Sequence, residues 1–230
     1  MKPISRASLH THTKFSDGMV SPTELVKAAA DKGISVLALT DHDTMKGLTE
    51  AKAAGKKYGV EIIPGEEITA GSIFKQKHIL ALNISKPISH SMSVEKTIDA
   101  IHKQGGLAII SHVEGINASV SVDELEALLQ THKIDALEGI NGRFDKRRKL
   151  KKFKLPLIGV SDSHYGAKDI LSAYTEFPGK TAQDLLRAIK DGTVRAVPGI
   201  YQLIPKTQKI RQHFRSWILV GAKRYILASL

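Results

Sequence analysis

Residues 9 to 18 read LHTHTKFSDG, placing two histidines and an aspartate directly after a short apolar segment. Because side chains alternate along a strand, His10 and His12 point to the same side, about 6.6 Å apart along the chain. Two imidazoles at that separation can bind one metal ion together. We therefore expect His10 and His12 to end the first strand of the fold, with Asp17 close behind them.

The rest of the chain alternates short apolar runs with amphipathic helices. Helix starts are marked by N-caps and capping boxes, such as Ser21 with Glu24 and Ser121 with Glu124. About seven strand–helix units in 200 residues predict an α/β fold with parallel βα units closed into a distorted seven-stranded barrel. The expected domain covers residues 1–200, and residues 201–230 form a short basic C-terminal helical tail.

The composition limits the function classes. The chain has 230 residues, 42% of them hydrophobic and 25% charged, as in ordinary soluble domains. It has no cysteine, so any metal must be bound through nitrogen and oxygen ligands. No leader-like or membrane-spanning apolar run is present, which makes a cytoplasmic location the expectation.

The net charge of +11 is concentrated in two segments. Residues 143–154, RFDKRRKLKKFK, contain eight basic residues and one acid, and residues 192–230 contain seven basic residues and no acid. We expect the first segment to be a solvated helix. In the second, Ile210, Phe214, Trp217, Ile218 and Tyr225 follow one helical stripe. The favoured interpretation is a helix packed on the barrel or on a second subunit; the alternative is contact with an anionic surface or nucleic acid.

Most of the polar residues with metal-ligand chemistry follow the apolar runs, where the strands of a βα barrel build its active site. Imidazole and carboxylate ligands together favour manganese, zinc or iron. One ion needs three or four ligands, so the surplus indicates two or three divalent ions. The nine candidate ligands are His10, His12, Asp17, His42, Glu67, His78, His112, Asp162 and His164.

Five motifs resemble those of the PHP (polymerase and histidinol phosphatase) family, and in the same order. They are HTHTKFSDG, LTDHDT, PGEEIT, SH after an apolar strand, and GVSDSH. The sequences EGINGR and AYTEF are also similar to stretches of its stand-alone metal-dependent phosphoesterases. The resemblance extends to about residue 200 and implies a TIM-like barrel of the PHP type that binds up to three metals.

The resemblance also implies how the ligands divide among the ions. It places His10, His12, Glu67 and Asp162 around one ion. It makes Glu67 a bridge to a second ion, held also by His78 and His112. It assigns Asp17, His42 and His164 to a third.

The chain departs from the family pattern in two places. Only 33 residues separate His78 from His112, so the helical insert common in branch members that act on nucleoside bisphosphates is absent. Val113 stands where the family usually has proline.

The expected activity is hydrolysis of a phosphate ester by metal-activated water, with no separate general acid assigned. The expected substrate is a phosphomonoester, including a nucleotide or nucleic-acid end, and Arg143 is the candidate substrate-binding residue because guanidinium binds phosphate bidentately. The alternatives are a histidinol-phosphate phosphatase and a non-catalytic, metal-stabilised nucleic-acid-binding module.

Some residues keep a second interpretation. Asp17 also suits capping of the SDG turn, His78 begins an apolar run instead of ending one, and Arg143 also suits an exposed helix start. Asp41 and Asp43 are expected to support the site or cap a turn instead of binding metal.

Overall fold

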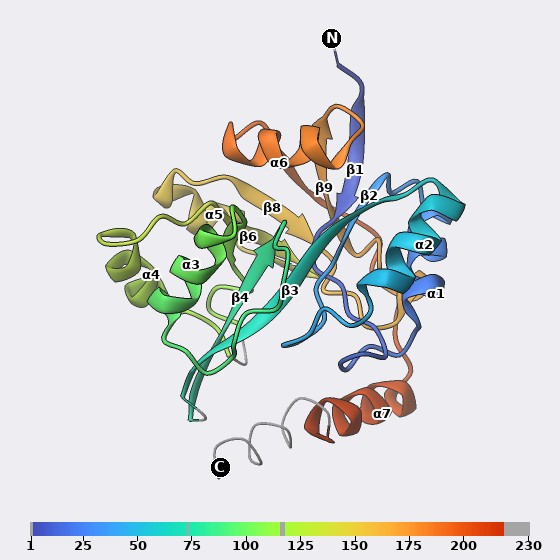
Figure 1. Ribbon diagram of the computed structural model, residues 1–230, viewed down its shortest axis with the longest axis horizontal. Helices are drawn as coiled ribbons and strands as arrows, with labels where there is room; N and C mark the ends of the chain where they lie inside the picture. The colour runs from blue at the N-terminus through green and yellow to red at the C-terminus, as the bar shows by residue number, and fades with distance from the viewer. Residues whose placement is uncertain (1, 73, 116–117, 219–230) are drawn as a thin grey trace.

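A curved sheet with helices on its outside forms the body of the molecule (Figure 1). The computed structural model describes residues 2–72, 74–115 and 118–218. Its ten strands are β1 (Ile4–Ser8), β2 (Val36–Leu39), β3 (Glu61–Ser72), β4 (Lys75–Leu82), β5 (Leu107–Ile110), β6 (Ala136–Asn141), β7 (Phe144–Asp145), β8 (Leu157–Val160), β9 (Ala173–Pro178) and β10 (Arg195–Pro198).

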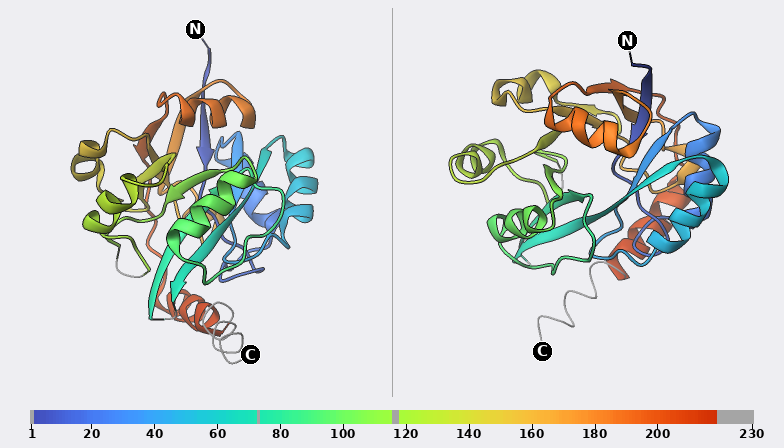
Figure 2. Two further views of the ribbon diagram at one scale, coloured as in Figure 1. Left: turned by 60° about the vertical axis from the view of Figure 1, so that its left-hand side comes forward. Right: turned by 45° about the horizontal axis from the view of Figure 1, so that its top comes forward.

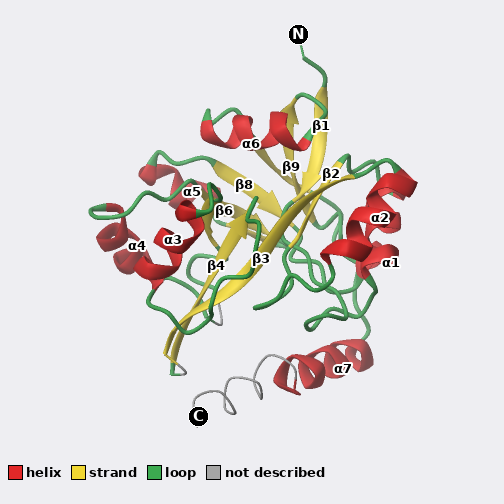
Figure 3. Ribbon diagram, in the orientation of Figure 1, coloured by secondary structure: helices red, strands yellow, loops and turns green. Residues whose placement is uncertain are grey.

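The described chain has seven α-helices and two single 3₁₀ turns; α7 follows the last strand, and the others lie between strands. Figure 3 shows helices in red and strands in yellow. The helices are α1 (Pro22–Asp31), α2 (Leu48–Tyr58), α3 (Val94–Lys103), α4 (Val122–Leu129), α5 (Arg147–Leu150), α6 (Ala182–Lys190) and α7 (Lys206–Ser216). The 3₁₀ turns are η1 (Lys151–Phe153) and η2 (Gly166–Lys168).

The strands form an almost closed ring. Hydrogen-bonded neighbours follow the order β1, β2, β3, β4, β5, β6, and β8 pairs with β6. Beyond the strand ends, Thr11 and Ser163 form a parallel bridge that joins the β1 segment to the β8 segment. The barrel expectation is therefore confirmed at the level of an α/β, barrel-like sheet. The sheet has three strands more than the expected seven, because β9 and β10 extend it beyond β1 and β7 pairs with β6.

The expectation of parallel βα units is wrong for three strands. β4 follows β3 in a long hairpin and runs antiparallel to both β3 and β5, while β7 runs antiparallel to β6 and β9 to β1. A hairpin needs no crossover helix, so β4 enters the ring at the end where the parallel strands finish.

The expected helix starts are confirmed. Ser21, Ser121 and Thr181 are N-caps, and each has a reciprocal capping box with the residue three positions later. The expected basic helix over 143–154 is wrong: it divides into β7, α5 and η1. Lys154 takes a left-handed backbone (φ 55°), and Pro156 disfavours helix in the residue before it, so no longer helix forms.

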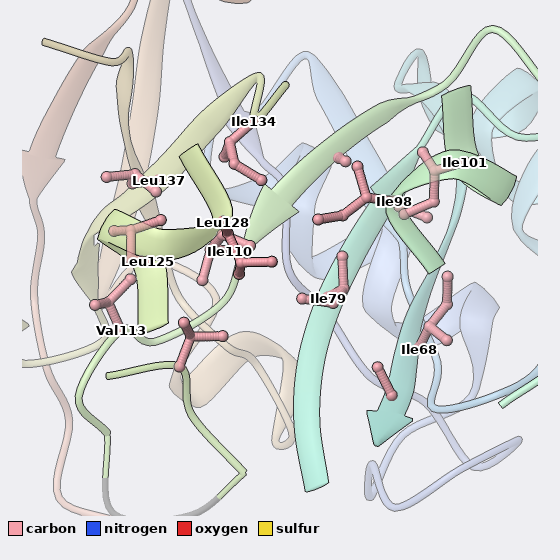
Figure 4. Close-up of a cluster of buried hydrophobic side chains, with 14 of the residues drawn as sticks. Ile68, Ile79, Ile98, Ile101, Ile110, Val113, Leu125, Leu128, Ile134 and Leu137 are labelled. Atoms are coloured by element: carbon pink, nitrogen blue, oxygen red, sulfur yellow. The ribbon is translucent and has the colours of Figure 1, made fainter. Parts of the chain in front are cut away.

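Apolar side chains fill both faces of the sheet. Inside the ring, Ile63, Leu80, Ile109, Ile158 and Val160 belong to one cluster, which Leu185 of α6 covers. Outside, α3 and α4 pack on β3 to β6 through isoleucine and leucine side chains (Figure 4). α6 covers one end of the ring, and α7 lies at the other end (Figure 1, Figure 2). Because Leu185 of α6 packs on the apolar cluster inside the ring, the polar site lies at the α7 end.

The tail differs from one half of the favoured expectation, packing on the barrel; the other half, packing on a second subunit, stays a prediction. The described part of its apolar stripe, Ile210, Phe214, Trp217 and Ile218, is exposed instead of packed on the barrel, and Tyr225 lies outside the described residues. Within the described chain, no helix has the length and hydropathy that a membrane crossing requires.

Candidate metal centre

The segment that follows β1 is held between the ends of two neighbouring strands. Thr11 N donates to Thr40 Oγ1 (2.9 Å), and His12 N donates to Ser163 O (2.8 Å). Both His10 and His12 are fully buried, with ring centroids 5.0 Å apart. The two rings thus lie together at the end of the barrel near α7.

Glu67, on the inner face of β3, is the centre of the histidine cluster. Its Oε1 lies 3.0 Å from His78 Nδ1 and 3.2 Å from His112 Nε2. Its Oε2 lies 2.9, 3.2 and 3.3 Å from ring nitrogens of His10, His12 and His42, respectively. The two carboxylate oxygens therefore face two different sets of imidazoles.

Asp17 joins a second group with three histidines. Its Oδ1 lies 3.3 Å from His164 Nε2 and 3.7 Å from His12 Nδ1, and its Oδ2 lies 3.9 Å from His42 Nε2. The carboxylate is buried and faces these rings, which the turn-capping alternative does not require. Gly18 makes this fold of the loop feasible, because a Cβ there would lie 2.4 Å from the carbonyl atoms of His12.

Asp162 brings a second carboxylate to His10 and His12. Its Oδ1 lies 3.3 Å from His12 Nε2 and 3.6 Å from His10 Nε2. The backbone of Asp162 is left-handed (φ 50°), and that of His112 also has a positive φ of 28°. Such conformations cost energy and concentrate at functional sites, where surrounding contacts maintain them.

The antiparallel direction of β4 explains the position of His78. His78 pairs with Thr69 near the start of β4, which lies at the end of the ring where the parallel strands finish. Its ring follows the same alternation as Leu80 and Leu82, both members of the cluster inside the ring. A histidine at the start of an antiparallel strand thus occupies the place of one at the end of a parallel strand.

The donor set fits divalent metal ions. In the described residues, three groups have ligand atoms within 4.8 Å of one another: His12, Asp17, His42 and His164; His10, His12 and Glu67; and His42, Glu67 and His78. Several of these buried atoms have no hydrogen-bond partner, namely His10 Nε2, both ring nitrogens of His12, His42 Nδ1, Asp17 Oδ1 and Asp162 Oδ1. Tetrahedral ligands about 2.1 Å from an ion lie about 3.4 Å apart, close to the separations among His10, His12, Glu67 and Asp162.

Glu138 on β6 supports the cluster, and sequence reasoning missed it. Its Oε1 accepts from His10 Nδ1 (2.6 Å), and its Oε2 accepts from His112 N (2.6 Å) and Asn141 Nδ2 (2.8 Å). A histidine ligand that donates one ring N–H to a carboxylate presents its other nitrogen to the metal. The motif EGINGR contains Glu138, but the sequence pattern points only to its arginine as a substrate-binding residue.

Two further buried aspartates fix the loops that carry the site. Asp41 accepts hydrogen bonds from the Thr13 backbone and hydroxyl and from Ser16 Oγ, as its expected supporting role requires. Asp169, missed from the sequence, accepts from Ser163 Oγ and His164 N. Asp43 Oδ1 accepts from the Thr69 backbone (2.7 Å).

Burial and mutual attraction set the charges of the cluster. Burial lowers the pKa of His42 to about 3. Burial also lowers the pKa of His164, but Asp17 outweighs it and raises that pKa to about 10. Burial raises the pKa of Glu67, but His10 and the neighbouring imidazoles outweigh burial and hold this pKa well below its usual range. The cluster thus combines ionised carboxylates with imidazoles, which suits a divalent cation.

Arg143 lies apart from the cluster. Its guanidinium lies 5.1 Å from the Phe144 ring centroid and 5.8 Å from that of Tyr201. It lines a cavity of about 250 Å³ whose wall also includes Asp162 and His164. Arg143 follows β6 and precedes β7, so the helix-start alternative is wrong.

The nine candidate ligands thus gather at one end of the ring, whereas the other histidines lie elsewhere. His90 contacts Ser91, His102 contacts Asp135, His132 contacts Thr131, and His213 contacts the backbone of Lys209.

Curated relatives share part of the sequence. A 5'-3' exoribonuclease of Haemophilus influenzae is 37% identical over 120 residues, 52% of this chain and 44% of that protein. A 3',5'-nucleoside bisphosphate phosphatase of Chromobacterium violaceum is 38% identical over 81 residues, 35% of this chain and 28% of that protein. The matches therefore span less than half of either relative.

Solved structures share the fold. A two-domain protein from Bacteroides vulgatus, described as containing a predicted PHP-like metal-dependent phosphoesterase, matches with a TM-score of 0.74 at 20% identity, covering 94% of this chain and 70% of that one. A putative metal-dependent phosphoesterase from Bifidobacterium adolescentis matches with a TM-score of 0.63 at 20% identity, covering 84% and 98%. The family model of the PHP domain matches residues 8–181, which include all nine candidate ligands. This chain belongs to the PHP domain family.

Proposed function

We propose that this chain is a metal-dependent phosphoesterase that hydrolyses a phosphomonoester, including one at a nucleotide or nucleic-acid end. The observation that carries the proposal is the set of buried, unpartnered nitrogen and oxygen atoms around Glu67, within a PHP domain. Relatives named as a nucleoside bisphosphate phosphatase and an exoribonuclease support the substrate class. Residues 1–200 are the proposed catalytic unit, and residues 201–230 the tail.

The proposed ligands divide among two or three ions of manganese, zinc or iron. One ion takes His10, His12, Glu67 and Asp162; a second takes Glu67, His78 and His112; a third takes Asp17, His42 and His164. The two oxygens of Glu67 face separate imidazoles, which supports a bridging role. His42 and His12 each belong to two of the geometric groups, so either has a second ion within reach.

Such ions, when bound, make water acidic enough to act as a nucleophile near neutral pH and offset the charge of the phosphate. The protein's own residues hold the ligands in place. Glu138 accepts the Nδ1 proton of His10, so that Nε2 faces Glu67 and Asp162. Arg143, on the wall of the adjoining cavity, binds the substrate through its guanidinium.

A substrate panel tests the proposal directly. The full chain is assayed with added manganese on a chromogenic monoester, a chromogenic diester, histidinol phosphate, a nucleoside bisphosphate and short RNA, with bound metal measured in parallel. We expect turnover that EDTA abolishes and that favours monoesters. A chain that carries metal but hydrolyses none of these contradicts the proposal, and a preference for histidinol phosphate selects that alternative.

Replacing His12 tests the ligand assignment. Because His12 lies within reach of Glu67, Asp17 and Asp162, His12→Ala is expected to lower bound metal and to reduce turnover by at least about 100-fold. Metal analysis, circular dichroism and rates are measured together. The matched control is His90→Ala, outside the cluster. Normal metal content and full activity in His12→Ala would contradict the assignment.

A further inference from the structure

The cavity beside the metal cluster has two walls of different origin. Asp162 and His164, at the end of β8, form its inner wall. Tyr201, Lys209 and Gln212, from the C-terminal segment, form part of its outer wall. These three residues lie beyond the matched family model, which ends at residue 181. A substrate that reaches the cluster through this cavity therefore meets the tail.

Helix α7 is held over this opening by polar contacts. Gln212 Nε2 donates to Asp17 Oδ2 (3.1 Å), directly at the cluster. Arg215 donates to the backbone carbonyls of Ser16 and Lys14. Figure 1 shows α7 below the barrel, apart from the other helices. These contacts orient α7 so that the face with Lys209 and Gln212 lines the cavity.

A further contact ties α7 to η2, where Lys168 Nζ donates to Gln208 Oε1 (2.8 Å). The exposed apolar side chains Ile210, Phe214 and Trp217 are not what holds the helix against the barrel. The position of α7 relative to the cluster is thus set by hydrogen bonds to the loop after β1 and to η2.

Two cations on the cavity wall have no carboxylate partner among the described residues. Arg143 and Lys209 form no ion pair there, unlike Arg147 and Lys149 nearby, which pair with Asp145 and Glu114. The rings of Phe144 and Tyr201 flank the Arg143 guanidinium and limit where it can lie.

The acids on the same wall do not neutralise these cations. Asp162 belongs to the metal cluster, and Asp169 already accepts hydrogen bonds from Ser163 Oγ and His164 N. The cavity therefore presents two uncompensated positive charges next to a site that carries its own cations when loaded. That arrangement favours a ligand with more than one anionic group.

We propose that Arg143 and Lys209 form a second anion subsite, and that α7 is thereby a specificity element that selects phosphate esters carrying a further anionic group. The inference rests on the proposed phosphoesterase activity. The reacting phosphate binds at the cluster, and the second group binds between the β6–β7 loop and α7. Arg143 then contacts the non-reacting group.

The test compares two substrates that differ by one phosphate, fructose 6-phosphate and fructose 1,6-bisphosphate, with the full-length chain. We expect the wild type to have the lower KM for the bisphosphate. Lys209→Ala should raise that KM about 10-fold or more, because a charge-assisted hydrogen bond is lost, while kcat and turnover of p-nitrophenyl phosphate change less than about 2-fold. The matched control, Lys206→Ala, removes the same charge from an exposed position of the same helix.

Three outcomes overturn the subsite: no preference of the wild type for the bisphosphate, equal effects of Lys209→Ala and Lys206→Ala, or an equal loss on p-nitrophenyl phosphate. Calorimetric binding of fructose 1,6-bisphosphate in EDTA separates this inference from the proposed function. If no ester is hydrolysed but binding still weakens about 10-fold in Lys209→Ala, the subsite stands and the phosphoesterase proposal fails. If esters are hydrolysed and binding does not depend on Lys209, the phosphoesterase proposal stands and the subsite fails.

Discussion

At the scale of single residues, Glu138 links the two histidines on either side of the cluster. One oxygen holds the His10 ring and the other holds the backbone of His112, so a single buried carboxylate orients two proposed ligands. Its side chain is buried from solvent. The importance of Glu138 therefore lies in the geometry it maintains.

Glu138→Gln tests this role. The amide has one accepting oxygen, so it cannot accept from both His10 Nδ1 and His112 N as the carboxylate does. We expect metal affinity to fall about 10- to 100-fold, with the protein still folded. Metal titration of the stripped protein measures the effect. Glu126→Gln, an exposed exchange on α4, is the matched control; unchanged affinity in Glu138→Gln would remove the positioning role.

Seven of the nine candidate ligands could be predicted from a local pattern of apolar strand and polar end; His78, at the start of an apolar run, and Asp17, in the loop after His12, do not show it. Glu138 could not be predicted in this way. Its side chain lies inside a run, IDALEGI, that has the appearance of a buried strand, and its partner His10 is 128 positions away. Contacts over such distances depend on the closed ring, which a local pattern does not encode.

At the scale of elements, helix ends were predictable and strand direction was not. Capping boxes such as that of Ser121 and Glu124 involve neighbours three residues apart, so the sequence carries them directly. The alternation of HILAL in β4 is the same in a parallel and an antiparallel strand. The hairpin of β3 and β4 therefore appeared only in the structure, and with it the reason for the position of His78.

Asp135 joins α3 to the start of β5 and β6. Its Oδ2 accepts from His102 Nε2 (2.8 Å) and from Ala108 N (2.9 Å). Burial opposes ionisation, but these hydrogen bonds outweigh it and lower the pKa of Asp135. Because the pKa is lower in the folded state, the ionised group stabilises the fold above its ordinary pKa of about 3.9. This contribution is lost as the pH falls through the lower, native pKa.

Asp135→Ala is accordingly expected to cost about 1–3 kcal/mol near pH 7, since it leaves the buried Ala108 N–H without its acceptor. The difference from the wild type should shrink as the pH falls below 4. Urea unfolding at several pH values measures it. Asp135→Asn keeps an accepting oxygen and should cost less; a pH-independent difference for Asp135→Ala would refute the role of its charge.

At the scale of the whole molecule, the ring is completed where β8 meets β9 without a ladder of backbone hydrogen bonds. The Thr175 hydroxyl accepts from Gly159 N (3.1 Å) and donates to Gly159 O (2.8 Å). Gly159 has no room for a side chain, because a Cβ would lie 2.3 Å from the Tyr174 carbonyl oxygen. The Thr175 hydroxyl and the absence of a side chain at Gly159 thus allow β8 and β9 to pack together.

Thr175→Val tests the junction with little change in shape. Removing the hydroxyl leaves both polar groups of Gly159 without their partner, so we expect a loss of about 1–3 kcal/mol in unfolding free energy. Thr175→Ser, which retains the hydroxyl, is the control and should lose less. Denaturant unfolding of the three proteins gives the comparison, and equal stability of Thr175→Val and wild type would show that the hydroxyl does not hold the junction.

The tail shows the limit of periodicity for predicting the whole molecule. The stripe of Ile210, Phe214 and Trp217 correctly predicts an amphipathic helix, yet those side chains are exposed and the polar residues Gln212 and Arg215 face the barrel. A hydrophobic pattern states which face is apolar, but the partner depends on shape and charge elsewhere in the fold. Here the loop after β1 provides the hydrogen-bond acceptors, and the side chains of the stripe stay largely exposed.

Ring closure also determines when the metal cluster can form while the chain is being synthesised on the ribosome. Ser8 and Ser161, whose hydroxyls meet where the ring closes, are 153 positions apart. At about 5–20 residues per second, His10 and His12 emerge roughly 8–30 seconds before the segment that carries Asp162. Long-range pairing of this kind is slow to form. The cluster therefore forms after most of the polypeptide has been made, and a chain interrupted before β8 has His10 and His12 but lacks Asp162 and His164.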